Sequence, residues 1–320
     1  MEAAIREPMR ARKAFSILGF SLLAAFAVRY GLEWLTHLYA QARGYAEPLS
    51  GWRYWVLNYL PFYLIAIPVG VLLMRIVPAA PRAKTTMRTK DFFLFLLMCF
   101  PLMYAGALVG NLLSLALLLG KAQNGLEALV TDSSPLKYLF MVVIGPFVEE
   151  FVFRKTLIDR ASAYGEKVAV LFSGMTFGLF HMNLFQFFYA AMLGMLFAYV
   201  YVRTRKLRYT VFMHMIINFV GSVIAPLVAA NIDTGALLAG DPGSSAPLAL
   251  AGALLYSSVY MGLSAAGTVM LVLKWKKFIF LPAPAQLERK AHFRTVYLNA
   301  GMIAFTLVCL GMCVYALFRA

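Results

Sequence analysis

The chain has 320 residues, of which 62% are hydrophobic and 13% are charged, and its mean hydropathy is +0.76. This composition excludes a water-soluble globular domain and predicts an all-α, polytopic transmembrane protein. The net charge of +15 at pH 7 would suit a nucleic-acid-binding protein as well, so the placement of the basic residues must decide what the charge means.

Apolar stretches of about 20 residues, the length that crosses a bilayer as a helix, follow one another along the whole chain. In chain order they cover 14–38, 54–77, 92–119, 136–160, 166–182, 184–202, 208–230, 246–273 and 295–318. The polar linkers between them are short, and no internal repeat is visible. We therefore expect about eight or nine spans in a single membrane domain, residues 1–320.

Basic residues collect in every second loop between these stretches. They precede the first span and fill the loops 75–90, 155–167, 203–208 and 274–294. The alternate loops carry the acidic residues Glu47, Glu127, Asp132, Asp233 and Asp241. By the positive-inside rule the N-terminus is cytoplasmic, and the charge reports topology and contact with anionic lipid. We expect no nucleic-acid partner, and the small hydrophilic loops are typical of a prokaryotic inner or plasma membrane protein.

The N-terminal segment combines a basic region with a long apolar run and lacks a small-residue cleavage site, which predicts an uncleaved signal anchor. The cysteines, Cys99, Cys309 and Cys313, all fall within predicted spans, and the last two lie one helical turn apart. We interpret them as small apolar packing residues, with neither a disulfide framework nor a metal site implied.

The most informative polar residues are Glu149 and Glu150, because two carboxylates inside an apolar span are costly. Glu150 and Arg154 are four residues apart and can form an ion pair on one helix face, whereas Glu149 is rotated by about 100° and remains the freer carboxylate. Pro146, preceded by Gly145, interrupts the helical hydrogen bonds one turn earlier and is expected to kink the span. The alternative is that both glutamates only bridge helices through Arg154.

Two later spans carry further polar pairs. Phe177 and His181 share one face at the end of 166–182, and His214 and Asn218 share one face within 208–230. Each pair alone is consistent with a polar helix end or with a tie between two helices. Together with the two glutamates they indicate a site.

The order EExxxR, FxxxH and HxxxN on successive membrane segments resembles the CPBP family of intramembrane proteases, which includes the type II CAAX prenyl endopeptidases and bacteriocin-processing and immunity (ABI-like) proteins. The resemblance covers residues 136–220, the expected core of the domain. One departure is Lys155, where many members have a glycine. The resemblance implies an endopeptidase that acts on a membrane-associated peptide or protein substrate.

The resemblance also implies roles for these residues. Glu149 and His181 would activate a water molecule, and His214 and Asn218 would stabilise the oxyanion. Glu150, Arg154 and Phe177 would support them. We expect the catalytic cavity among the fourth to seventh spans, open toward the basic, cytoplasmic side, and we expect catalysis without a cofactor.

Several alternatives stay open at this point. Glu149, His181 and His214 could instead hold Zn²⁺ as three ligands. A proton-coupled transporter would use buried Glu, Arg and His as a relay, and a haem protein would use the two histidines as axial ligands. A non-proteolytic scaffold or immunity protein of the same family would retain the motifs. CAAX processing itself is not favoured, because prenylated substrates are mainly eukaryotic.

Overall fold

The computed structural model describes residues 2–46, 48–80, 83–118, 129–130, 132–230, 232 and 247–318, and within these residues the regular structure is entirely helical. This confirms the all-α, polytopic architecture. Four of the acidic residues assigned to the alternate loops, Glu47, Glu127, Asp233 and Asp241, lie outside the described residues.

Seven helical segments among the described residues are long and apolar enough to cross a membrane. They are Arg10–Ala42, Gly51–Met74, Thr89–Leu117, Leu184–Thr204, Leu207–Ala229, Pro247–Lys277 and Ala300–Leu317. The predicted spans 136–160 and 166–182 are helical too, but neither qualifies as an apolar crossing. Glu149, Glu150 and Arg154 interrupt the apolar run of the first, and the helix in the second has only 15 residues.

The elements follow one another in this order. α1 (Glu2–Ala42) precedes a composite helix made of α2 (Gly51–Tyr54), the π-helical segments η1 (Trp55–Tyr59) and η2 (Phe62–Ala66), and α3 (Ile67–Met74); α4 (Thr89–Leu118) follows. The glutamates lie on α6 (Leu136–Tyr138), η3 (Leu139–Ile144), α7 (Gly145–Glu150), η4 (Phe151–Ile158) and α8 (Asp159–Ala161), which the 3₁₀ turn η5 (Ser162–Tyr164) follows.

The remaining elements complete the bundle. They are α9 (Glu166–Phe180), α10 (Leu184–Thr204), α11 (Leu207–Phe219) with η6 (Val220–Ile224) and α12 (Ala225–Ala229), α14 (Pro247–Lys274), the 3₁₀ turns η8 (Trp275–Lys277) and η9 (Arg289–Ala291), α15 (His292–Val296) and α16 (Ala300–Phe318).

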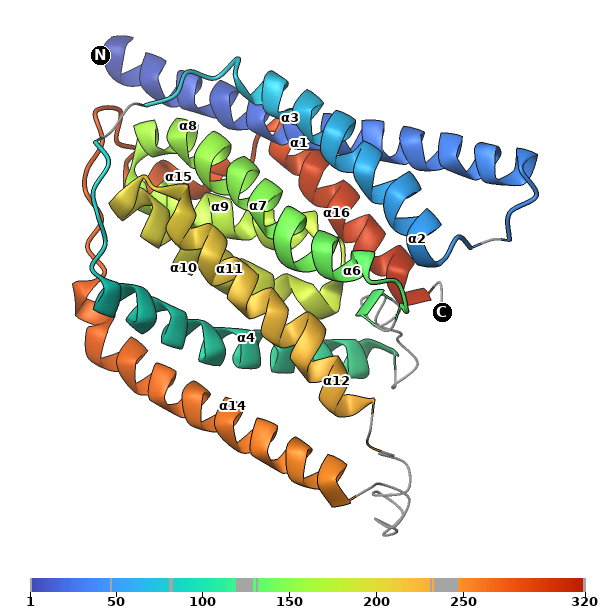
Figure 1. Cartoon of the computed structure of the whole chain (residues 1–320). Coiled ribbons are helices and arrows are strands. Elements are labelled where there is room, and N and C mark those ends of the chain that lie inside the picture. Colours follow the sequence, from blue (N-terminus) through green and yellow to red (C-terminus); the bar gives the residue numbers. More distant parts are fainter. Residues whose placement is uncertain are drawn as a thin grey trace.

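The motif-bearing helices lie in the middle of the bundle (Figure 1). α1 runs along one edge with α3 and α16 against it, and α14 forms the opposite edge against α4. α9 packs against α10, and most of its side chains are buried. By contrast, the described part of α14 buries only Ser264 and Gly267, as expected of a helix that faces lipid. The helix that carries Phe177 is therefore among the best-packed elements of the bundle.

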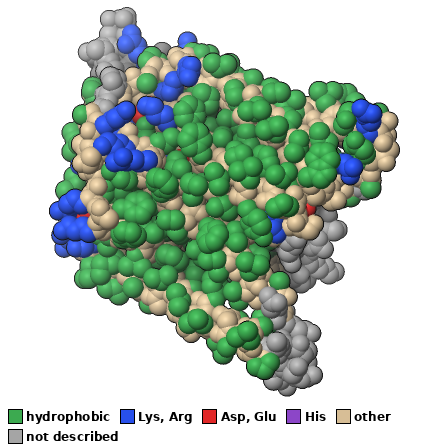
Figure 2. Space-filling model, viewed as in Figure 1, with side chains coloured by type: hydrophobic (Ala, Val, Ile, Leu, Met, Phe, Trp, Pro, Cys, Tyr) green, Lys and Arg blue, Asp and Glu red, His purple; other side chains and the backbone are tan. Residues whose placement is uncertain are grey.

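One end of the bundle carries the basic loops 75–90, 155–167, 203–208 and 274–294, and we call it the basic end. Figure 2 shows Lys and Arg side chains gathered along this edge and hydrophobic side chains over much of the visible face. Hydrogen bonds close this end: Asp159 Oδ1 accepts from Arg205 Nη1 and Tyr201 Oη, each at 3.0 Å. Glu166 Oε2 accepts from the backbone N–H of Leu281 at 2.7 Å, which binds the loop before α15 to the start of α9.

The opposite end has its own anchor. Asp132 Oδ1 accepts from Trp55 Nε1 and Oδ2 from the backbone N–H of Gly51, both at 3.1 Å. The carboxylate therefore joins the loop before the glutamate helix to the start of α2.

Candidate active site

The adjacent glutamates lie on one helical rod that runs without a break from Leu136 to Ala161. The π-helical segments η3 and η4 stand directly before and after α7, which carries Pro146, Glu149 and Glu150. Proline has no N–H to donate and its ring displaces the carbonyl one turn earlier, so the helix widens there. The effect expected of Pro146 is thus accompanied by a change in helical winding around the glutamates.

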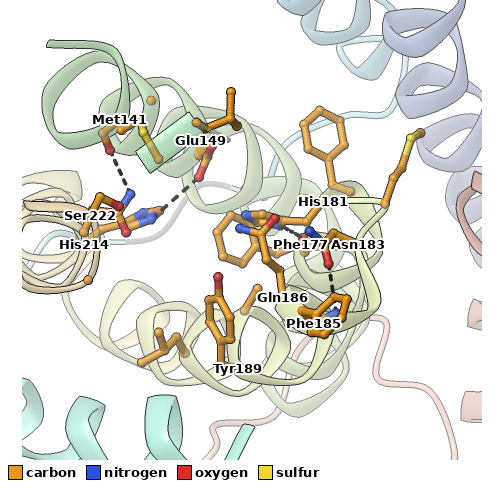
Figure 3. Close-up of a pocket in the computed structure, with 18 of the residues that line it drawn as sticks. Met141, Glu149, Phe177, His181, Asn183, Phe185, Gln186, Tyr189, His214 and Ser222 are labelled. Carbon is orange, nitrogen blue, oxygen red and sulfur yellow. Dashed lines mark hydrogen bonds and ion pairs between the residues drawn. The ribbon is translucent and has the colours of Figure 1, made fainter. Parts of the chain in front are cut away.

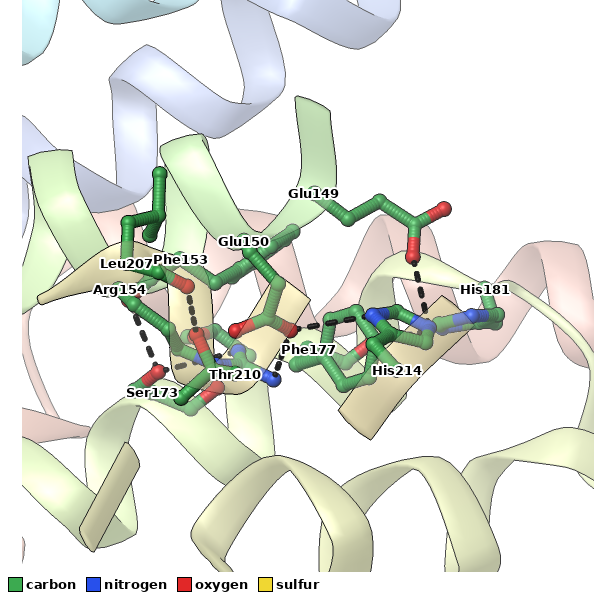
Figure 4. Close-up of polar contacts among 11 residues, drawn as sticks. Glu149, Glu150, Phe153, Arg154, Ser173, Phe177, His181, Leu207, Thr210 and His214 are labelled. Carbon is green, nitrogen blue, oxygen red and sulfur yellow. Dashed lines mark hydrogen bonds and ion pairs between the residues drawn. The ribbon is translucent and has the colours of Figure 1, made fainter. Parts of the chain in front are cut away.

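Glu150 belongs to a network without solvent access. Its Oε1 lies 2.9 Å from Arg154 Nη2, and both side chains are 0% exposed. The same oxygen accepts a hydrogen bond from His214 Nδ1 at 3.1 Å (Figure 4). Arg154 Nη1 donates to Ser173 Oγ at 3.4 Å. The ion pair expected from the four-residue spacing is present, and it extends to the imidazole of α11.

Phe177 separates this network from the space beside Glu149. Its ring centroid lies 4.6 Å from Arg154 Cζ, a cation–π distance. The His181 and His214 rings stand nearly perpendicular to it at centroid distances of 4.8 and 5.7 Å. One buried phenyl ring therefore positions the guanidinium and both imidazoles.

A cavity of about 550 Å³ opens on the other side of Phe177. It is lined by all four residues predicted to be catalytic, namely Glu149, His181, His214 and Asn218, which come from three separate parts of the chain (Figure 3). Glu149 is 24% exposed, and its Oε2 lies 3.7 Å from His214 Nε2. The partly solvated carboxylate of Glu149 thus lies next to the imidazole of His214, whereas the neighbouring carboxylate of Glu150 is completely buried.

Hydrogen-bond partners determine which nitrogens of the histidines carry protons. His181 Nδ1 lies 2.8 Å from the carbonyl oxygen of Phe177. A carbonyl only accepts, so Nδ1 is the protonated nitrogen and Nε2 of the neutral ring is an acceptor. The ionised carboxylate of Glu150 likewise accepts from His214 Nδ1, which leaves Nε2 of His214 toward Glu149.

Asn218 both lines the cavity and joins two helices. It lines the cavity, and its Nδ2 also donates to the carbonyl oxygen of Met141 at 2.9 Å. One amide hydrogen therefore ties α11 to η3, whereas the second is not committed to that bond. The side chain of Asn218 therefore fits both interpretations of the HxxxN pair, because it faces the cavity and also links two helices by a hydrogen bond.

The expectation that the cavity opens toward the basic end is wrong. Its wall includes the turn between α9 and α10 at Met182–Leu184, the last turn of α16 at Leu317, and Leu129, all at the end opposite the basic loops. Toward the basic end, the buried Glu150–Arg154 pair and Phe153 fill the interior. Motif spacing alone carries no information on which end of the helices is filled.

Three cavity residues were not anticipated from the sequence. Tyr189 of α10 points its hydroxyl into the cavity, near Gln186 one turn earlier (Figure 3). Tyr63 lines the same cavity as Glu149, and its hydroxyl and Glu149 Oε1 both lie beside Gly145. Tyr189 sits in an aromatic run that resembles lipid-facing sequence, and the isolated Gln186 within it was the available signal.

The three candidate zinc ligands do not form one cluster in the structure. Across the described ranges, no group of three or more His, Cys, Asp or Glu side chains has an arrangement that could hold a metal ion. Glu149 and His214 approach each other, but His181 does not complete a set of three with them in this conformation.

Comparisons with known proteins agree with the motif arrangement. Residues 131–220 match the family described as type II CAAX prenyl endopeptidase Rce1-like. The chain is also 28% identical over 106 residues to YdiL of Bacillus subtilis (strain 168), which is named as a candidate membrane peptidase. That alignment covers 31% of this chain and 42% of the relative, less than half the relative's length. No solved structure matches the chain. EExxxR, FxxxH and HxxxN all lie within the matched residues, so the likeness to the Rce1-like family, and to membrane peptidases in general, rests on the segment that carries the motifs.

Proposed function

We propose that this chain is an intramembrane endopeptidase of the glutamic type, which hydrolyses a peptide bond in a membrane-associated substrate. The observation that carries the proposal is the contrast between two adjacent carboxylates. Glu149 is 24% exposed in a cavity lined by two histidines and an asparagine, whereas Glu150 is fully buried in an ion pair. Two carboxylates whose surroundings differ this strongly are suited to different tasks.

Glu149 is the proposed general base. A water molecule in the cavity would donate one hydrogen bond to Glu149 and a second to Nε2 of His181, which is an acceptor in the neutral ring. Glu149 takes a proton from this water as its oxygen attacks the scissile carbonyl carbon. The proton then passes from Glu149 to the leaving amide nitrogen as the C–N bond breaks, which gives a carboxylic acid and an amine and returns Glu149 to its carboxylate form.

The oxyanion needs hydrogen-bond donors, and neutral His181 offers none toward the cavity. His214 can donate from Nε2 when both of its nitrogens are protonated, with Nδ1 directed at Glu150. Asn218 has the amide hydrogen that Met141 does not take. Each such donor contributes on the order of 3 kcal/mol in comparable sites.

Tyr189 is a further candidate donor, because its hydroxyl points into the same cavity (Figure 3). We expect Tyr189→Phe to lower kcat by roughly tenfold to a hundredfold with little change in KM, since the ring and its packing are retained. Tyr199→Phe is the matched control, because Tyr199 lies on the same helix α10 and does not line the cavity. Equal activity of the two variants would remove Tyr189 from the mechanism.

Glu150 and Arg154 are proposed as positioning residues. The Glu150 carboxylate fixes the protonated nitrogen of His214, and Arg154 compensates the buried charge of that carboxylate. The catalytic role would be held by Glu149 alone, which explains why the chain carries two glutamates at this point.

The proposal is tested with purified protein in detergent and a library of membrane-segment peptides. Wild type is compared with Glu149→Gln and with Glu288→Gln, the same change at an exposed glutamate in the loop 274–294 that does not line the cavity. We expect cleavage by wild type and Glu288→Gln, loss of at least a hundredfold in Glu149→Gln, and no effect of a strong chelator.

Two other outcomes would overturn the proposal or part of it. Loss of cleavage with chelator and recovery with zinc would replace the metal-free mechanism by a metal site at Glu149, His181 and His214. Absence of cleavage by wild type across the library would favour a scaffold or transporter.

A further inference from the structure

The direction in which the cavity opens bears on the compartment of the substrate. Short loops with an excess of Lys and Arg stay on the cytoplasmic side of a membrane, and this bias sets the orientation of the protein. The basic end carries such residues in four loops, 75–90, 155–167, 203–208 and 274–294. The described basic residues in loops and near helix ends at the opposite end are Arg43, Arg53 and Lys137. The charge bias therefore places the basic end in the cytoplasm.

The cavity lies in the other half of the bundle. The cavity is lined by the C-terminal end of α9, the start of α10 and the last turn of α16. The basic loops are attached to the opposite ends of these helices. Arg29 and Tyr54, both on the wall, also line a second cavity that adjoins it on the side of α1 and η1. The route into the site is thus polar at the end away from the basic loops.

Between the cavity and the basic end the interior is filled. Five side chains there are completely buried, namely Glu150, Phe153, Arg154, Ser173 and Thr210. A peptide entering from the basic end would have to displace the buried Glu150–Arg154 pair, and separating the partners of a buried ion pair leaves an uncompensated charge in the interior.

We propose that the cavity receives its substrate from the extracytoplasmic face of the membrane, and that the cleaved segment belongs to a membrane-anchored protein and reaches the site from that face. This inference rests on the proposed function for the nature of the substrate, but not for the direction of entry. It assigns the site to the compartment opposite to the one expected from the sequence.

The length of the rod indicates how far the substrate must reach. Glu149 lies 13 residues after Leu136, where the rod begins at the non-basic end, a distance of about 20 Å. An extended peptide advances about 3.3 Å per residue, so roughly six residues must unwind between the membrane boundary and the scissile bond. The substrate is therefore a segment cut within the membrane.

The direction of entry is tested by cysteine labelling in intact cells, which requires no catalysis. The native cysteines Cys99, Cys309 and Cys313, all buried, are first replaced by alanine. Single cysteines are then introduced as Ser222→Cys on the cavity wall, Ser133→Cys in the exposed loop at the non-basic end, and Thr86→Cys in an exposed basic loop. The probe is a sulfonated maleimide that does not cross membranes.

We expect Ser222→Cys and Ser133→Cys to react in intact cells and Thr86→Cys to react only after the membrane is permeabilised. Reaction of Ser222→Cys only after permeabilisation, or of Thr86→Cys in intact cells, would overturn the proposal. A Ser222→Cys that never reacts, in protein whose Thr86→Cys and Ser133→Cys forms react normally, would overturn it as well. Absence of proteolysis leaves this labelling pattern unchanged, so the two proposals fail separately.

Discussion

The buried ion pair makes a quantitative prediction about stability. Arg154→Met removes the guanidinium but keeps a long apolar side chain against Phe177. Glu150 then stays buried and loses its charge partner, while the hydrogen bond from His214 Nδ1 remains. Leaving one partner of a fully buried pair uncompensated costs about 3–5 kcal/mol, which is a factor of roughly 10² to 10⁴ in the unfolding equilibrium.

The double variant Glu150→Gln/Arg154→Met separates charge from packing. Because neither charge remains, we expect it to recover more than half of the stability that Arg154→Met loses. Its activity should nevertheless stay low, since His214 no longer faces a carboxylate on its Nδ1 side. Stability and activity are therefore expected to diverge in this variant.

The free energy of unfolding is measured by raising the SDS fraction in mixed micelles and following far-ultraviolet circular dichroism. Lys155→Met is the matched control: it breaks the next four-residue pair on the same helix, Lys155–Asp159, whose side chains are 50% and 14% exposed. That change should cost no more than about 1 kcal/mol. Equal losses in Arg154→Met and Lys155→Met, or a double variant less stable than Arg154→Met, would refute the reasoning.

Two further changes test other parts of the structure. Hydrogen bonds from Trp55 and two backbone N–H groups outweigh desolvation and hold the pKa of Asp132 below its ordinary value. Asp132 therefore contributes its full stabilisation above about pH 4, and this contribution is lost as the pH falls through the lower pKa of the folded state. In Asp132→Asn, the free energy of unfolding should fall less steeply as the pH is lowered through this range. Gly174→Ala would place a Cβ 2.8 Å from the backbone nitrogen of Met195, so we expect α9 and α10 to separate and thermal stability to fall by about 1–3 kcal/mol. Gly252→Ala, with nothing within 4 Å, should cause no such loss.

The sequence predicted the helical elements and the neighbours along each helix well, because both depend on short-range spacing. Residues four apart on a helix share a face whatever the tertiary structure, so the pairing of Glu150 with Arg154 followed directly. The ordered motifs then indicated which faces meet, and Glu149, His181, His214 and Asn218 do line one cavity. Their chemical roles remain predictions.

What the sequence did not predict depends on long-range packing. Tyr189 reaches the cavity because α10 packs closely on both α9 and α4, and nothing in its aromatic neighbourhood distinguishes it from a lipid-facing residue. The contact between His214 and both glutamates was not anticipated either, since spacing along α11 does not say which residues of another helix it meets. The end at which the cavity opens also depends on which helices pack together, so spacing along the chain did not predict it.

The π-helical turns on both sides of Glu149 and Glu150 have a consequence for how this helix tolerates change. Each π-helical turn holds one residue more than an α-helical turn, so the direction of each glutamate depends on the number of residues between it and the ends of the rod. Deleting a single residue from Leu139–Ile144 and winding the remainder as regular α-helix leaves the chain fully helical. Because six residues of π-helix and five residues of α-helix turn by nearly the same angle, the helix on either side keeps its direction. The same deletion in a regular α-helical stretch would rotate everything before it by about 100° relative to the glutamates. The π-helical turns are therefore the places in this rod where the loss of one residue leaves the glutamates directed into the cavity.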